Sequence, residues 1–193
     1  MNPAEIAVLI LASGQSRRFG EGNKLLAPFR GQPLGAHVLM ATTSFPSCYA
    51  VVPTAESPLI DLYTEAGVRI VSNPTPEAGQ GASLALGISE IMHGNAKAAL
   101  IVLADMPFIA PTDLEAVCAA LGAADVVASE RDGRLMPPVL FSRAHFEALS
   151  RLSGEAGGRD YLRQLKDVHR VPLRDEAAID IDTEESLYRY DQA

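Results

Sequence analysis

Residues 6–24 read "IAVLILASGQSRRFGEGNK", and this stretch decides the fold. The apolar run 6–12 is followed by small and polar residues and then by the cations Arg17, Arg18 and Lys24. A continuous apolar run is typical of a strand covered on both faces, as in parallel sheets. The cations contrast with the net charge of the chain, which is -8. We therefore expect a parallel sheet whose first strand leads into a local site for an anion.

The length and composition limit the class of protein. A chain of 193 residues suits one domain, so we expect residues 1–193 to fold as a single unit. Hydrophobic residues make up 48% of the chain, which is enough to bury a substantial core. Asp and Glu (24) outnumber Lys and Arg (16), and this balance argues against a general surface for nucleic acid or for an anionic membrane.

Cysteines, histidines and apolar segments indicate a cytoplasmic protein. Cys48 and Cys118 form neither a disulfide framework nor a zinc-ligand spacing. The four histidines are scattered, without a carboxylate or cysteine at ligand spacing, so we expect structural roles for them. The N-terminus lacks the pattern of a signal peptide. No apolar run approaches the roughly 20 residues that a membrane span needs, so no membrane partner is expected.

Apolar runs alternate with helical patterns over the first two thirds of the chain. The expected strands are Ile6–Ala12, Tyr49–Pro53, Val68–Ser72, Ala98–Ala104 and Asp125–Ser129. The expected helices are Pro33–Thr43, Glu56–Ala66, Gly81–His93 and Thr112–Leu121, with Pro33 and Pro111 at positions where a helix can begin. Strands and helices in alternation predict an α/β fold with a mainly parallel sheet and right-handed crossovers.

The alternation ends after Glu130, where "RDGRLMPPVLF" combines turn residues, two prolines and a short apolar segment. Helical patterns follow, then a short strand pattern, and Thr183 has the character of a helix start. We interpret this last third as an elaboration of the same domain. The segments are two helices, Arg143–Arg151 and Gly158–Lys166, and one strand, Val168–Pro172.

The loop after the first strand is a candidate phosphate site. In open α/β sheets, ligands collect at the carboxyl ends of strands. Gly14 lets the backbone approach a phosphate closely, and Arg18 and Lys24 can neutralise its oxygens. Two unit charges about 4 Å apart attract by roughly 4 kcal/mol at an effective dielectric near 20, before desolvation is subtracted. The loop matches neither the P-loop nor the dinucleotide-binding motif, and a plain loop with solvated cations is the alternative.

The stretch "LASGQSRRFG…K" resembles the signature L-A-[AG]-G-x-S-x-R-[MF]-G-x-x-(x)-K of MobA-like nucleotidyltransferases. Further motifs follow in order: "NPTPEAGQGASLALGI" at 73–88, "LADMPFI" at 103–109, "PPVLFSRAHFEALSRLSGEAGGRDYL" and "IDIDTEESL". The resemblance covers nearly the full chain and is strongest to the molybdenum cofactor cytidylyltransferase group. It implies a Rossmann-like, three-layer nucleotidyltransferase fold, a Mg²⁺-nucleotide substrate and release of pyrophosphate.

This chain departs from the family pattern at three places. Ser13 replaces the usual Ala or Gly, and three residues separate Gly20 from Lys24 where the family usually has two. Met136 and Pro137 stand where many relatives have Gly-His before the "PVLF" segment. That segment is expected to face the acceptor substrate, so this last departure concerns the acceptor.

Carboxylates are the candidate metal ligands. Asp105 ends the most apolar strand, and Mg²⁺ usually takes one or two carboxylates together with substrate phosphates. Asp182 is the best second ligand, with Asp180 on the same strand face as a fallback. As alternatives, Asp105 caps a turn and Asp182 is the N-cap of the last helix.

The resemblance also assigns roles around the nucleotide. Arg18, Lys24 and Asp105 are expected to be catalytic, and the segment after the third strand is expected to line the pocket for base and ribose. Amide and hydroxyl groups there can bind a base edge, although the same residue types form ordinary turns and caps. The expected nucleotide-binding residues are Leu11, Ala12, Ser13, Gly14, Arg18, Lys24, Asn73, Gln80, Gly81, Ser83 and Asp105.

The expected reaction is transfer of CMP from Mg-CTP to the phosphate of molybdopterin. CTP is expected over GTP because guanylyl-transferring relatives usually carry a double glycine where this chain has Ser13-Gly14, and because residues 138–159 resemble the cytidylyl group. The alternatives are a guanylyltransferase, a nucleotidyltransferase for another phosphorylated acceptor, and a non-catalytic carrier that assists cofactor insertion. A recipient molybdoenzyme is a further expected partner.

Overall fold

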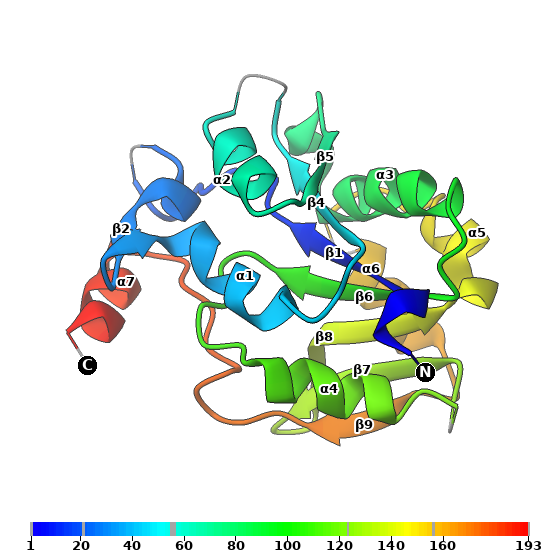
Figure 1. Cartoon of the computed structure of the whole chain (residues 1–193). Helices are drawn as coiled ribbons and strands as arrows, with labels where there is room; N and C mark the ends of the chain where they lie inside the picture. The colour runs from blue at the N-terminus through cyan, green and yellow to red at the C-terminus, as the bar shows by residue number, and fades with distance from the viewer. Residues whose placement is uncertain (1, 21, 55–56, 123, 156, 193) are drawn as a thin grey trace.

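The computed structural model describes residues 2–20, 22–54, 57–122, 124–155 and 157–192. Its centre is a seven-stranded sheet in the order β5-β4-β1-β6-β8-β7-β9 (Figure 1). The strands are β1 (Ile6–Leu11), β4 (Cys48–Val52), β5 (Arg69–Ser72), β6 (Ala98–Leu103), β7 (Val126–Arg131), β8 (Arg134–Ser142) and β9 (His169–Pro172). Of these seven, β8 alone runs antiparallel to its neighbours, so the mainly parallel α/β sheet is confirmed.

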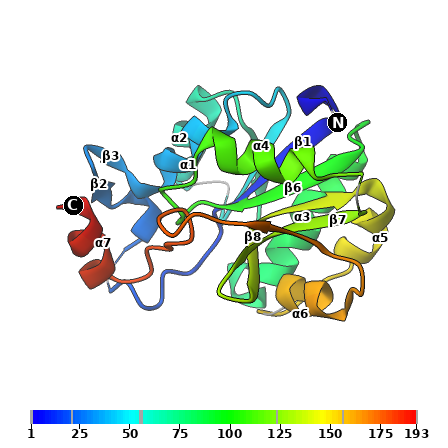
Figure 2. The same ribbon diagram turned by 90° about the horizontal axis from the view of Figure 1, so that it is seen from below.

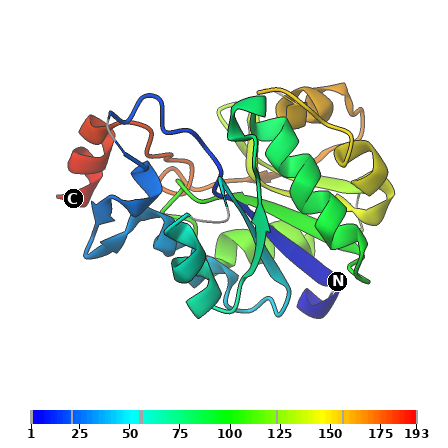
Figure 3. The same cartoon turned by 90° about the horizontal axis from the view of Figure 1, so that it is seen from above.

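Helices cover both faces of the sheet and make three layers (Figure 3). One face carries α1 (His37–Thr42), α2 (Leu59–Glu65) and α4 (Pro111–Ala119). The other face carries α3 (Gln80–Met92), α5 (Phe146–Leu149) and α6 (Gly157–Gln164). In the part of the chain that the structure describes, no helix combines the length and the apolar character needed to cross a bilayer.

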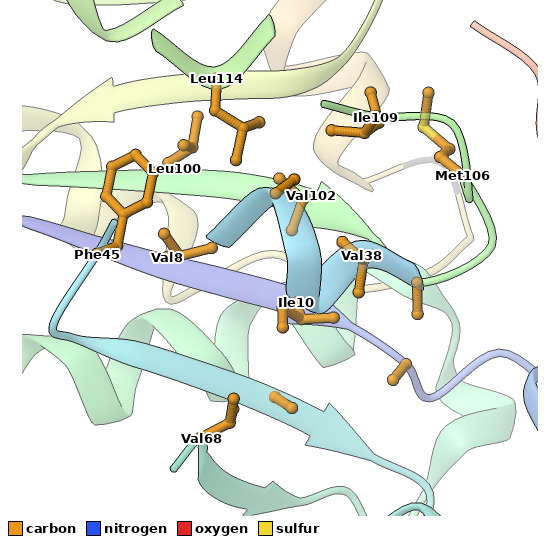
Figure 4. Close-up of a cluster of buried hydrophobic side chains, with 14 of the residues drawn as sticks. Val8, Ile10, Val38, Phe45, Val68, Leu100, Val102, Met106, Ile109 and Leu114 are labelled. Atoms are coloured by element: carbon orange, nitrogen blue, oxygen red, sulfur yellow. The ribbon is translucent and has the colours of Figure 1, made fainter. Parts of the chain in front are cut away.

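Alternate residues of the buried strands supply the two cores. Val8 and Ile10 of β1 point to the first face, whereas Ala7 and Leu9 point to the second. Figure 4 shows the first core, in which β1 and β6 side chains meet Val38 of α1. Burial of one such aliphatic side chain contributes about 1.5–3 kcal/mol, so continuous apolar strands need a helix on each face.

A small lobe lies beyond the carboxyl ends of the central strands (Figure 2). It contains the hairpin of β2 (Pro28–Phe29) and β3 (Gln32–Pro33) and the last helix, α7 (Glu184–Asp191). These segments are far apart in sequence but adjacent in space, because the backbone N–H of Arg30 donates to the Asp191 carboxylate at 2.6 Å. The lobe stands next to the end of the sheet where ligands are expected.

Three expectations about the elements are wrong. Pro33 does not begin a helix: it ends the hairpin, a 3-10 turn covers Leu34–Ala36, and α1 begins only at His37. The segment Arg143–Arg151 is a 3-10 turn, Arg143–His145, followed by the short helix α5. The expected helix Glu56–Ala66 begins at Leu59 in the structure, and Glu56 lies outside the described residues.

The long strand β8 was expected only as a short apolar segment. Proline cannot donate a backbone hydrogen bond, so a pair of prolines argues against a central strand. The structure accommodates them in an irregularity: Ala128 pairs with Val139 but the next residue, Ser129, pairs with Met136. Pro137 and Pro138 therefore fall between the paired positions, and the strand continues on both sides of them.

Candidate functional site

The ends of the central strands bring the first loop and Asp105 together. β1 and β6 are paired in register up to Leu11 and Leu103. The Ala104 N–H then donates to the Leu11 carbonyl at 3.2 Å, which extends the pairing by one step. Ser13 and Asp105 consequently lie side by side, just beyond the carboxyl ends of the neighbouring strands β1 and β6.

The C-terminal segment returns to this edge and delivers Asp182. The buried Ile181 donates its N–H to the carbonyl of Asp105 at 2.9 Å. Thr183 is the N-cap of α7, because its hydroxyl accepts from the Ser186 N–H at 3.1 Å. Asp182 is therefore not the cap of this helix, and its side chain is available to the site.

Lys24 bridges the two aspartates. Its ammonium nitrogen lies 2.6 Å from Oδ2 of Asp105 and 2.7 Å from Oδ1 of Asp182. The Arg18 guanidinium donates to the other oxygen of Asp182 at 2.6 Å. The Lys24 side chain is only 9% exposed, whereas that of Arg18 is 73% exposed. The cluster thus has a buried inner cation and an outer cation that faces solvent.

Mutual attraction keeps this cluster charged. Burial alone would lower the pKa of the Lys24 ammonium, but the charges and hydrogen bonds of Asp105 and Asp182 outweigh burial and raise it. Burial alone would raise the pKa of Asp182, but the hydrogen bond from Lys24 and the charges of Lys24 and Arg18 hold it below its usual value. Lys24 and Asp182 are therefore both ionised at neutral pH.

Asp180, the fallback carboxylate, lies nearby but outside the cleft lining. Much of this residue faces solvent, yet partial burial of its carboxyl and the charges of Asp182 and Asp105 raise its pKa. The like charges of the three aspartates therefore act on one another, and Asp182 is the one that contacts Lys24.

The charged cluster lies on the wall of a cleft of about 280 Å³. Most of the expected site residues line this cleft: Leu11, Ser13, Gly14, Arg18, Lys24, Gln80, Ser83, Asp105 and Asp182. Three do not: Ala12 is buried in the core, Asn73 is fully buried, and Gly81 packs against another loop. The first loop, the carboxyl end of β6 and the start of α3 therefore meet around one space.

Asn73 supports the cleft from behind. Its amide nitrogen donates to the hydroxyl of Ser13 at 2.9 Å and to that of Ser83 at 3.1 Å. Its amide oxygen accepts from the Thr75 N–H at 2.9 Å. An amide that is satisfied on both ends fixes the two serine hydroxyls in the cleft wall.

The sequence alone did not single out several lining residues. They are Gln15, Ser16, Leu25, Pro76, Gly79, Leu103 and Glu155, whereas Arg17, another lining residue, belongs to the cation cluster that the sequence pointed to. The loop residues follow from the position of the first loop, and Leu103 ends the strand that carries Asp105. Glu155 comes from a distant loop, which reaches the cleft because the Gly81 N–H donates to the Gly154 carbonyl at 2.8 Å. Nothing local to Glu155 signals this contact.

The two aspartates suit a divalent cation. Oδ1 of Asp105 is buried and has no hydrogen-bond partner among the residues that the structure describes, and a bare carboxylate oxygen is the kind of ligand that Mg²⁺ prefers. Within the described ranges, no cluster of three or more His, Cys, Asp or Glu side chains could hold a metal ion. Asp105 and Asp182 would therefore hold such a cation only in part, with phosphate oxygens and water completing its shell.

Known proteins of similar sequence match most of the chain. The molybdenum cofactor guanylyltransferase of Cupriavidus metallidurans is 30% identical over 97% of this chain and 95% of its own length. The purine catabolism protein PucB of Bacillus subtilis is 28% identical, covering 80% of this chain and 79% of PucB. The nicotine blue oxidoreductase of Paenarthrobacter nicotinovorans is 29% identical over 94% of both chains.

Solved structures and a family model agree with this similarity. Rv0371c from Mycobacterium tuberculosis superposes with a TM-score of 0.86 at 26% identity, over 100% of both chains. A CMP:2-keto-3-deoxy-manno-octonic acid synthetase in complex with CTP shares the fold, with a TM-score of 0.73 at 13% identity over 97% of both chains. Residues 8–169 match the model of the MobA-like NTP transferase domain. This chain, whose candidate site is the cleft at the carboxyl ends of β1 and β6, thus belongs to the MobA-like NTP transferase family.

Proposed function

We propose that this protein transfers a nucleoside monophosphate from a nucleoside triphosphate to a phosphorylated acceptor, with CTP as donor and molybdopterin as acceptor. The observation that carries the proposal is the contact of Lys24 with Asp105 and Asp182 in the wall of the cleft. Cations for phosphates and carboxylates for a metal are what a nucleotidyl transfer needs at one point. The family of the chain supports the same class of reaction.

In the proposed reaction, an oxygen of the acceptor's terminal phosphate attacks the α-phosphorus of the nucleotide. A new phosphorus–oxygen bond forms, and the bond between the α-phosphorus and the bridging oxygen to the β-phosphate breaks. Pyrophosphate leaves with that electron pair. No protein nucleophile is required, because alignment and charge neutralisation supply most of the catalysis in phosphoryl chemistry.

Lys24 and Arg18 are the proposed cationic groups. In the structure both are paired with carboxylates, so an incoming triphosphate has to compete with Asp105 and Asp182 for them. Exposed Arg18 exchanges partners at little cost, since its guanidinium is already solvated. The ammonium group of Lys24 is almost fully buried, so a ligand can reach it only from the cleft. We infer that Arg18 meets the triphosphate first and that Lys24 binds it when its contacts to the aspartates loosen.

Asp105 and Asp182 would hold a divalent cation, for which we propose Mg²⁺. A bound cation of this kind supplies positive charge to the phosphates of the nucleotide. Rv0371c, which is 23% identical to this chain in a second crystal structure, has been solved as a complex with manganese. The buried Oδ1 of Asp105 is the feature of this chain that supports the assignment.

The donor is the finer part of the proposal. Ser13-Gly14 in place of a double glycine and the segment 138–159 favour CTP. A guanylyltransferase is the second candidate, because the C. metallidurans relative carries that name. A pocket built for cytosine excludes a purine by size and leaves its own polar groups unpaired, at about 1–3 kcal/mol per missed hydrogen bond. We therefore expect at least roughly tenfold discrimination.

A pyrophosphate-release assay tests the proposal. The protein is incubated with Mg²⁺, molybdopterin and CTP, GTP or ATP in turn, and kcat/KM is compared. Release that needs molybdopterin and is fastest with CTP is expected. Equal or faster release with GTP would favour the guanylyl candidate. Release that needs a different phosphorylated acceptor would change the substrate, and no release with any pair would leave only a carrier role.

A further inference from the structure

We propose that Arg30 is a positioning residue, which holds α7 in place so that Asp182 stays beside Asp105 and Lys24. Arg30 does not line the cleft and has no role in the family signature described above. The inference rests on the proposed function, because it concerns the metal-binding geometry of that site. It is carried by the contacts of Arg30 with two other segments of the chain.

The first set of contacts grips the end of α7. The Nε and Nη2 atoms of Arg30 donate to the Tyr190 carbonyl at 3.2 and 3.0 Å. Its backbone N–H donates to the Asp191 carboxylate at 2.6 Å. The last carbonyls of a helix have no partner within it and carry partial negative charge, so a guanidinium there is doubly favoured.

The second set of contacts joins Arg30 to the loop after β6. The guanidinium carbon lies 4.9 Å from the ring centre of Phe108 and 5.6 Å from that of Phe29. Phe108 packs edge-on against both Phe29 and Tyr190, with ring centres 5.8 and 5.9 Å apart. A cation over such rings contributes about 0.5–1 kcal/mol at an exposed site.

These contacts tie together the three segments that carry the site. The hairpin of Arg30 follows shortly after Lys24, Phe108 comes three residues after Asp105, and α7 begins two residues after Asp182. Figures 2 and 3 both show the hairpin and α7 side by side, away from the sheet. Arg30 therefore contacts both the loop after β6 and the end of α7 from its own hairpin.

The side chains of α7 are at most partly buried. None of its residues is fully buried, and only Leu187 and Tyr190 pack against the core as partly buried side chains. A helix of eight residues is too short to be stable by itself. The bonds of Lys24 and Arg18 to Asp182 and of the Ile181 amide to Asp105 hold the start of this segment, and the contacts to Arg30 hold its far end.

Arg30 also has an unusual backbone. Its φ is 47°, in the left-handed region, and Gly31 follows with a φ of 83°. A two-residue hairpin turn of this kind prefers Asn-Gly, so arginine here costs some conformational energy. The side-chain contacts of Arg30 offset that cost, and Asn is the natural substitute that removes the guanidinium without straining the turn.

The experiment compares Arg30→Asn with the parent and with Arg189→Ala. Arg189 is an exposed arginine of the same helix whose side chain pairs with Glu185 at 2.9 Å, so its removal controls for a general loss of helix stability. Two quantities are measured without nucleotide: the Kd for Mn²⁺, from the electron paramagnetic resonance of free Mn²⁺, and hydrogen exchange of the Ile181 amide. The Ile181 amide reports the bond to the Asp105 carbonyl.

We expect Arg30→Asn to raise the Kd for Mn²⁺ by about tenfold, the lower end of what loss of an outer-shell partner costs. Ile181 is expected to exchange faster, and Arg189→Ala is expected to leave both quantities near the parent values. Arg30→Lys keeps the charge over the rings but loses the paired hydrogen bonds to the Tyr190 carbonyl, so its Kd for Mn²⁺ and its Ile181 exchange rate should lie between those of the parent and of Arg30→Asn. This variant also provides the test if Arg30→Asn does not fold.

The result that would overturn the inference is a Kd for Mn²⁺ in Arg30→Asn that equals the Kd of the Arg189→Ala control. A parent that binds no Mn²⁺ would instead count against the proposed metal centre. In that case, hydrogen exchange of the Ile181 amide tests the positioning role. Exchange that is faster in Arg30→Asn but not in Arg189→Ala supports the role, and exchange that is unchanged in Arg30→Asn contradicts it.

Discussion

The two carboxylate oxygens of Asp105 have different surroundings. Oδ2 accepts from the Lys24 ammonium at 2.6 Å, whereas Oδ1 is buried and finds no hydrogen-bond partner within the described ranges of the chain. An unsatisfied buried acceptor costs about 1–3 kcal/mol, and a protein keeps such a group where a ligand offsets the cost. The proposed cation would bind at this oxygen, so Asp105 is the residue whose charge matters most to the site.

Asp105→Asn preserves the volume of the side chain and removes its charge. We expect metal-dependent turnover to fall by about 100-fold and metal affinity to fall with it, because a neutral amide is a poor ligand for a hard cation. Turnover and Mn²⁺ binding are measured across a metal titration. Asp160→Asn, at an exposed carboxylate of α6, is the control and should match the parent. Superimposed titrations for Asp105→Asn and the parent would make Asp105 a turn residue only.

Asp182 predicts a pH dependence of stability. Its pKa is lower in the folded chain than the unfolded value of about 3.9. The stabilisation from this group is therefore complete above that unfolded value and is lost as pH falls through the lower folded pKa. Between about pH 5 and pH 2, the difference in unfolding free energy between the parent and Asp182→Asn should shrink. Urea titrations at each pH measure it, and a difference that stays constant would contradict the account.

The start of α3 is held by close backbone packing against the loop that carries Glu155. A Cβ atom on Gly81 would lie 2.7 Å from the Ser153 carbonyl oxygen, closer than such atoms approach. A Cβ on Gly14, in contrast, would meet nothing within 4 Å. The two glycines therefore have different roles: Gly81 permits close packing between α3 and the loop, and Gly14 leaves room in the cleft for a ligand.

This contrast yields a prediction for the pair of alanine variants. Gly81→Ala should lower the free energy of unfolding by about 1–3 kcal/mol, as overpacking does. Gly14→Ala should change it by less than about 0.5 kcal/mol while weakening nucleotide binding. Denaturant unfolding and nucleotide titration measure the two effects. Equal losses of stability in both variants would mean that the loop does not pack on α3 as described.

Sequence patterns predicted the elements unevenly, for physical reasons. Strands covered on both faces, such as β1 and β6, are continuous apolar runs that allow few other conformations. β8 was missed because Pro137 and Pro138 argue locally against a strand, and only the pairing partners on both sides override that preference. The hairpin at 28–33 was missed because Pro33 fits a helix start as well as an edge strand.

The charge of the whole molecule opposes the ligand that we propose for it. A net charge of -8 repels a polyphosphate at long range, and Arg17, Arg18 and Lys24 are gathered on one wall of the cleft. Among these, salt screens the exposed Arg18 strongly and the buried Lys24 much less. Attraction of the nucleotide from solution therefore depends mainly on the outer cations.

The dependence of nucleotide affinity on salt concentration tests the separate roles of Arg18 and Lys24. From about 50 to 500 mM salt the Debye length falls severalfold, so nucleotide affinity of the parent should drop. The loss of affinity with salt should be smaller in Arg18→Gln than in the parent, because this variant has already lost the screened contact. Arg134→Gln is the control, since Arg134 is exposed and does not line the cleft, and its loss of affinity should equal that of the parent. Isothermal titration at several salt concentrations gives the slopes. Parallel slopes for Arg18→Gln and the parent would remove Arg18 from nucleotide attraction.

At the level of the whole chain, the position of a site residue decided whether sequence reasoning could find it. Lys24 and Asp105 follow the ends of strands that become neighbours, so the topology rule located both. Glu155 and Arg30 reach the site, or its support, through loops that contact residues far away in sequence. No local pattern encodes such contacts, because they depend on how finished elements pack.

The central claim, that this cleft transfers a nucleoside monophosphate, is tested most directly by following the phosphorus atoms of the nucleotide. Molybdopterin and Mg²⁺ are incubated with CTP that carries radioactive phosphorus in the α-position, and in a parallel reaction in the γ-position. The account predicts that the α-label enters the pterin product while the γ-label appears in pyrophosphate, and that Asp105→Asn slows both reactions by about 100-fold. Transfer of the γ-label to the acceptor, or incorporation of the α-label that is unchanged in Asp105→Asn, would contradict it.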